Sequence, residues 1–252
     1  MTVRSAGVRW LDEDLGPARR HEQEGSAPGS RPIVDLRYRL GATGPREVEE
    51  APGAQALLIA FDPDSPPLRV HFHTVDQFQY FTDGHGRLGG HDVAAGSLHY
   101  ADAFTPYGPI EFGPQGATFW TLRADPQFGA NYMPESRDEL GRRLESSARP
   151  APDRRNVSFD LKAVTVGMPG TWQPVAGDTD GMAVDVMDVP AGEEVPAPAR
   201  RGYVLVVGGT LDAHGIERSE GEAAWWEPTD APATVGTAVT PARVALLAFP
   251  GR

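Results

Sequence analysis

Histidine is concentrated in one short part of the chain. Five of the seven histidines lie between His71 and His99. The first two form a His-x-His pair, and alternate residues of a β-strand project from one face, so His71 and His73 point to the same side. Neutral imidazoles are good ligands for divalent transition metals. The pair therefore indicates a metal site, which a small β-barrel would complete with Gln77 and His99.

The spacing around the pair resembles the first motif of the cupin family. That motif is His-x-His, three or four residues, Glu, six residues and Gly. His71, His73, Gln77 and Gly84 follow this spacing, with Gln in the place of Glu. The glycine that cupins have six residues before the pair is replaced here by Ser65.

The second cupin motif, Pro-x-Gly-x-x-His, is similar to the segment that ends at His99. Ala94 replaces its proline, Gly96 matches its glycine, and Ala103 stands where an asparagine follows in cupins. The resemblance implies an all-β fold of two cupin (jelly-roll) β-barrels in tandem. It also implies one divalent transition metal (Zn, Fe, Mn or Ni) in the first barrel, bound by the three histidines, with Gln77 as a weaker fourth ligand.

Gln77 is the informative departure from the cupin motif, because an amide oxygen is a neutral donor. Three imidazoles and an amide leave the full charge on the metal, which favours Lewis-acid chemistry on an oxygen substrate and acidification of a bound water. Iron is also compatible with such a neutral set. Gln77 could instead be an amide that lines the barrel. Asp76 is a rival ligand in a shifted register, or a group that faces outward or orients a histidine.

Other polar residues near the third histidine are candidates for acid–base chemistry. Tyr107 and Glu111 are the candidate catalytic residues, since a hydroxyl or carboxylate beside the metal can move protons; the alternative is a structural role. Gln79 has the same strand parity as Gln77 and is expected to line the pocket. His85 and His91 lie in a glycine-rich segment and are predicted to be on the surface.

Composition limits the class of protein. The net charge of −12 argues against a surface that binds nucleic acid. Cysteine is absent, which excludes disulfides and thiolate metal sites. No apolar run approaches the ~20 residues of a membrane span, and the N-terminus has no signal-peptide core. We therefore expect a cytoplasmic protein that binds a small molecule, and a homodimer formed through strand edges.

Glycine and proline are abundant, at 29 and 24 residues, which favours short strands joined by turns. One helix is predicted over 135–144, and Asp83-Gly84 and Gly89-Gly90 are predicted turns. The predicted strands are 33–40, 56–61, 68–73, 78–82 and 118–122. The expected organisation is an N-terminal arm (1–31), a barrel with the metal site (32–130), a helix and linker (131–157) and a degenerate barrel (158–252).

The second barrel is predicted to have lost the metal. The positions that correspond to the His-x-His pair are Pro198 and Arg200, and His214 is the only histidine of this half. One histidine cannot form a three- or four-ligand site. This barrel is therefore expected to contribute packing rather than chemistry.

Three functions fit these features. The first is a mononuclear metal-dependent enzyme that acts on a small oxygen-rich molecule as a cyclase, isomerase or dioxygenase. The alternative is a non-catalytic sensor of a small molecule or metal, and the third is a structural bicupin. The nearly intact first site disfavours the structural role, and the fold alone cannot choose among chemistries.

Overall fold

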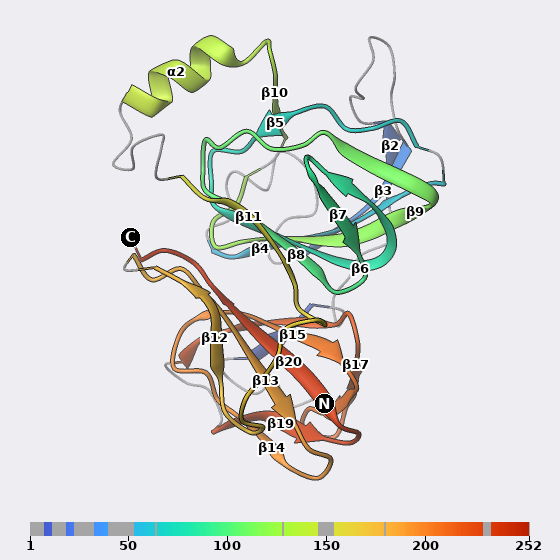
Figure 1. The fold of residues 1–252 in the computed structure, drawn as a ribbon, viewed down its shortest axis with the longest axis vertical. Coiled ribbons are helices and arrows are strands. Elements are labelled where there is room, and N and C mark those ends of the chain that lie inside the picture. Colours follow the sequence, from blue (N-terminus) through green and yellow to red (C-terminus); the bar gives the residue numbers. More distant parts are fainter. Residues whose placement is uncertain are drawn as a thin grey trace. The chain divides into compact units, whose positions relative to one another are not determined.

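The computed structural model describes residues 8–11, 19–22, 33–39, 53–63, 65–127, 129–145, 154–178, 180–228 and 233–251. The chain forms two compact units (Figure 1). Leu15–Phe159 is called the histidine unit, because it contains the histidine-rich segment. Met1–Asp14 and Asp160–Arg252 together form the terminal unit.

The histidine unit consists of antiparallel strands. Its large sheet has the order β11-β8-β6-β9-β4-β3-β2, with β7 paired to β6, and a small sheet pairs β10 with β5. The elements are β2 (Arg19–Glu22), β3 (Ile33–Arg39), β4 (Gln55–Phe61), β5 (His71–Phe72), β6 (Gln77–Leu88), β7 (His91–Ala94), β8 (Ser97–Ala101), β9 (Ile110–Arg123), β10 (Asn131–Tyr132), α2 (Arg137–Glu145) and β11 (Asn156–Asp160).

The strand β6 is longer than the sequence predicts. The expected turn at Asp83-Gly84 is wrong, because β6 continues to Leu88 and the chain turns at Gly89-Gly90. Gly84 has a φ of +76°, and a Cβ there would lie 2.2 Å from the Gly116 carbonyl oxygen. This glycine therefore permits a close approach of β6 to β9, where the register shifts, instead of reversing the chain.

The terminal unit is also built from antiparallel strands. A six-stranded sheet has the order β1-β18-β15-β20-β13-β12, and a four-stranded sheet has the order β14-β19-β16-β17. The strands are β1 (Val8–Trp10), β12 (Gln173–Gly177), β13 (Ala183–Val189), β14 (Glu194–Pro196), β15 (Gly202–Gly208), β16 (Thr210–Asp212), β17 (Glu217–Ser219), β18 (Ala223–Trp226), β19 (Thr234–Ala238) and β20 (Ala242–Ala248).

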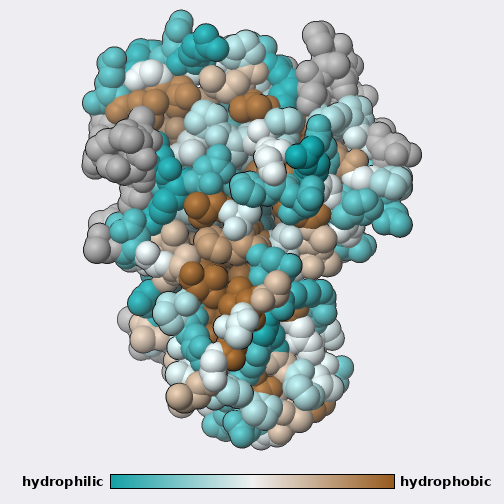
Figure 2. All heavy atoms as spheres, viewed as in Figure 1, coloured by the Kyte–Doolittle hydropathy of each residue, from teal (hydrophilic) through white to brown (hydrophobic). Residues whose placement is uncertain are grey.

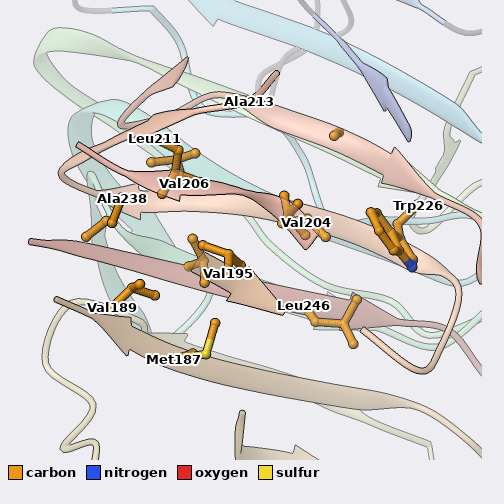
Figure 3. Close-up of a cluster of buried hydrophobic side chains, with 14 of the residues drawn as sticks. Met187, Val189, Val195, Val204, Val206, Leu211, Ala213, Trp226, Ala238 and Leu246 are labelled. Carbon is orange, nitrogen blue, oxygen red and sulfur yellow. The ribbon is translucent and has the colours of Figure 1, made fainter. Parts of the chain in front are cut away.

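Apolar side chains from the two sheets form the core of the terminal unit. Met187 and Leu246 of the six-stranded sheet belong to one buried cluster with Val195 and Leu211 of the four-stranded sheet (Figure 3). Alternate residues of β13, β15 and β20 contribute to it, as the two-residue period of a strand requires. Trp226 is fully buried in the same cluster. This core gives the second half of the chain its packing.

The N-terminal residues differ from the arm that the sequence predicts. Val8–Trp10 form β1 and pair with β18, so that Val8 lies opposite Trp226. Trp10 and Leu11 are buried. Arg19–Glu22 form β2, which pairs with β3 of the histidine unit. Strands of three or four residues carry little strand signal of their own, and here the neighbouring strand decides the conformation.

The predicted all-β fold is confirmed, and α2 is the one α-helix in the part of the chain that the structure describes. It corresponds to the predicted helix over 135–144. No helix among these residues is long and apolar enough to cross a membrane. On the face shown in Figure 2, hydrophobic residues gather in patches between hydrophilic ones. Within the described ranges the exposed large hydrophobic residues are Met168, Ile216 and Val239.

Candidate functional site

His71 lies on β5, next to the segment that contains Tyr107. The backbones of the two residues exchange hydrogen bonds of 3.0 and 3.1 Å. The His71 side chain is buried, with its Nδ1 2.7 Å from the Arg69 carbonyl oxygen and its Nε2 2.9 Å from the Tyr107 hydroxyl. A carbonyl oxygen only accepts hydrogen bonds, so Nδ1 carries the proton of the neutral ring and Nε2 presents its lone pair.

His73 follows two residues later and is also buried. Its ring is nearly perpendicular to that of His71, at 87°, with 5.3 Å between the centroids. The Arg123 Nη2 lies 3.2 Å from Nδ1 and 3.4 Å from Nε2 of His73. Arg123 ends β9 directly opposite Gln77 of β6, and only 3% of its surface is exposed. A guanidinium is therefore buried beside the two histidines.

His99 enters the same region from β8, where it pairs directly with Gln79 of β6. Its Nδ1 lies 3.0 Å from the Ser158 hydroxyl oxygen on β11. The Asp102–Arg155 ion pair, with 2.8 Å between Oδ1 and Nη2, holds the start of β11 against the end of β8. The His99 Nε2 and the Gln79 Oε1 are buried and have no hydrogen-bond partner within the described ranges.

His71, His73 and His99 form a cluster with Arg123 and Tyr107, and Gln77 connects Arg123 to Tyr107. Its Oε1 accepts hydrogen bonds from Arg123, at 3.2 Å from Nε and 3.0 Å from Nη2. Its Nε2 donates to the Tyr107 hydroxyl oxygen at 2.5 Å. The amide oxygen that the cupin resemblance assigns to a metal is thus directed at a guanidinium in this structure.

The two candidate catalytic residues are placed very differently. The Tyr107 ring is buried among the histidines, with its centroid 4.5 Å from that of His71, 6.2 Å from that of His73 and 5.2 Å from that of His99. Glu111 is exposed near the start of β9, opposite Arg87. The structure therefore brings Tyr107 into the cluster and does not bring Glu111 there.

Burial keeps the three histidines neutral. It lowers the pKa of His71 from 6.5 to about 4, that of His99 to about 3, and that of His73 well below 6.5. The charge of Arg123 lowers the pKa of His71 and His73 further. Burial also raises the pKa of Tyr107, against the opposing effects of Arg123 and of the Gln77 hydrogen bond. The imidazoles are therefore in the form that can bind a metal.

The donor chemistry fits a divalent transition metal. The His99 Nε2, which has no hydrogen-bond partner among the described residues, and the His71 Nε2, which presents a lone pair, are buried nitrogen atoms that can bind a metal. A hydrogen bond at the Nδ1 of each ring holds that ring in place, as in metal-bound histidines. Within the described ranges, however, no three His, Cys, Asp or Glu side chains group closely enough to hold a metal. These histidines therefore need a further donor, or a local shift, to complete a site.

The other residues named from the sequence lie apart from the cluster. His85 and His91 are exposed, as predicted, although they belong to the paired strands β6 and β7. The Asp76 Oδ1 accepts a hydrogen bond of 2.8 Å from the Ala103 backbone N–H. In the terminal unit Pro198 is buried and Arg200 and His214 are exposed.

Two residues of the cluster, Arg123 and Ser158, were not identified from the sequence. Arg123 follows an apolar strand, and Ser158 lies far along the chain in a segment with no motif. Only the pairing of β9 with β6, and the return of β11 to β8, bring them to the histidines. One signal could have identified Arg123. Its position continues the alternate residues that form the buried face of the strand, where an arginine is unusual.

Comparison with known proteins gives a likeness of fold. No family model matches the chain, and no curated protein sequence matches it. A "putative dioxygenase" of Nostoc punctiforme has a similar structure, with a TM-score of 0.67 and 12% identity, covering 97% of this chain and 83% of that one. The pirin YhhW of Escherichia coli in complex with nickel(II) has a TM-score of 0.51 and 14% identity, covering 97% and 99%. The chain thus shares its fold with these two proteins over nearly its whole length.

Proposed function

We propose that the histidine unit binds one divalent transition metal through His71, His73 and His99, and acts on a small oxygen-rich molecule. Cyclisation, isomerisation and dioxygenation are the reactions proposed. The observation that supports this most is the buried His99 Nε2, which has no hydrogen-bond partner among the described residues and lies in a cluster of neutral imidazoles. The likeness in fold to a nickel(II)-bound pirin supports nickel as one of the metals to test.

A metal bound here would supply Lewis acidity toward a substrate oxygen. The residues of the chain would supply the surroundings. Arg123 places a buried positive charge beside His73 and Gln77, which favours a substrate with an anionic or strongly polar oxygen. Tyr107 offers a hydroxyl proton, which it donates to the His71 Nε2. The side chains of the cluster are themselves buried, which excludes bulk water from it.

Metal content is the first test of this function. Protein purified without a chelating column is expected to contain close to one divalent metal per chain, and apo protein is expected to saturate at one. His71→Ala or His73→Ala should abolish stoichiometric binding, because each removes one of three donors. Elemental analysis and titration with Zn(II) and Ni(II) measure the binding.

His85→Ala is the matched control, since this histidine is exposed on β6 outside the cluster. It should bind metal as the wild-type chain does. A chain that takes up no metal, or that keeps its metal after His71→Ala, would contradict the proposed function. A second tight site that survives His71→Ala would contradict the prediction that the second barrel has lost its metal.

A further inference from the structure

Tyr107 lies at the centre of the histidine cluster, and its hydroxyl forms hydrogen bonds with His71 and with Gln77. Its ring contacts those of all three histidines, and its hydroxyl contacts the His71 Nε2 and the Gln77 Nε2. The structure thus places a phenol oxygen where the imidazoles face one another. Any metal held by these histidines would have to bind beside that oxygen or displace it.

The hydrogen bonds of Tyr107 have a fixed direction. The Gln77 oxygen faces the guanidinium of Arg123, which only donates, so the Gln77 amide NH2 must be the group that faces Tyr107. The phenol oxygen therefore accepts from Gln77. The His71 Nε2 carries a lone pair, because Nδ1 donates to the Arg69 carbonyl. The phenol proton accordingly lies between the Tyr107 oxygen and the His71 Nε2, which are 2.9 Å apart.

That separation matches the spacing of neighbouring ligands on one metal. Two neighbouring atoms that each bind a transition metal at ~2.1 Å lie about 3 Å apart. The Tyr107 oxygen and the His71 Nε2 would therefore hold a metal with little movement of either atom, and the proton that they share would pass to solvent. None of the described polar contacts of Tyr107, Gln77 or the three histidines is a carboxylate. A phenolate would supply the negative charge that the imidazoles lack.

We propose that the Tyr107 oxygen is the fourth donor of the metal site, with Gln77 as the residue that positions it. This inference rests on the proposed metal site in the histidine unit. The cupin spacing suggests the amide oxygen of Gln77 as the fourth metal ligand. The phenol of Tyr107, which lies outside both cupin motifs, takes that place here.

The test uses Fe(III) as a spectroscopic probe and Zn(II) as a probe of affinity. Apo wild-type protein loaded with Fe(III) is expected to show a visible phenolate-to-iron charge-transfer band and tyrosinate vibrations in its resonance Raman spectrum. Tyr107→Phe should lose both signals, and its affinity for Zn(II) should fall about 100-fold, because even residues that only support a ligand contribute 10–100-fold. Circular dichroism checks that the variant is folded.

Tyr132→Phe is the matched control, since this tyrosine ring also lies near His71, at 5.7 Å between centroids. It should keep the band and the affinity. Loss of the band in Tyr132→Phe, or a Tyr107→Phe variant with unchanged Zn(II) affinity and band, would overturn the inference. If Fe(III) does not bind, the Zn(II) affinities decide; if Tyr107→Phe does not fold, the wild-type Raman spectrum and Tyr132→Phe decide.

The two proposals fail in different ways. Stoichiometric Zn(II) uptake that depends on His71 but is unaffected by Tyr107→Phe would leave the metal site standing and remove Tyr107 from it. Absence of stoichiometric uptake by the wild-type chain would remove both.

Discussion

The metal-free protein is expected to lose stability steeply between pH 6.5 and pH 4, by about 1.4 kcal/mol per pH unit for each buried histidine that is neutral when folded. The pKa of His71 is lowered from 6.5 to about 4 and that of His99 to about 3, chiefly by burial. The unfolded chain therefore takes up protons first as the pH falls. The stability is complete above pH 6.5 and is lost as the pH falls toward these folded-state values.

Denaturant unfolding at a series of pH values measures this slope. His99→Gln removes one titrating ring while keeping a polar side chain of similar size, so it should reduce the proton uptake on unfolding by about one. His85→Ala should leave the slope unchanged, because His85 is exposed in the folded chain as well. Equal slopes for the wild-type chain and His99→Gln would show that His99 is not buried in solution.

Replacing Trp10 by alanine is expected to destabilise the terminal unit by about 3–5 kcal/mol, the usual cost of removing a buried aromatic side chain. Trp10 is only 4% exposed and belongs to the buried cluster that contains Trp226. The Arg218 guanidinium lies 4.8 Å from the centroid of its ring and would lose that contact. Without this anchor, the pairing of β1 with β18 would also weaken.

Thermal unfolding and amide hydrogen exchange measure the effect of Trp10→Ala. Exchange should accelerate in β18, because β1 covers its edge in the sheet order. Met168→Ala is the control in the same unit, since that side chain is 63% exposed and should change stability by less than ~0.5 kcal/mol. If the two variants behave alike, the N-terminal strand does not contribute to the core.

Local patterns in the sequence were sufficient for the all-β fold and for part of the cluster. The two-residue period of a strand predicted that His71 and His73 project from the same side of their strand. The same period predicted that Gln77 and Gln79 share a face of β6. Both glutamines are buried there. The apolar runs of the second half likewise predicted buried strands, as at Val204 and Val206 of β15. These features depend only on neighbours a few residues apart.

Residues brought in by distant pairings could not be predicted in this way. Glu111 and Tyr107 were equal candidates by position in the sequence, yet one is exposed and the other is buried among three histidines. The difference arises from the bridge between the backbones of His71 and Tyr107, which fixes the place of the phenol.

By itself, then, the sequence determined which side chains share a strand face, because that follows from the geometry of a few consecutive residues. Tertiary structure alone decided that Arg123 faces Gln77, that Ser158 holds His99, and that Trp10 is part of the terminal unit. Each of these depends on the register between strands far apart in the chain, and that register is set by the packing of the whole sheet.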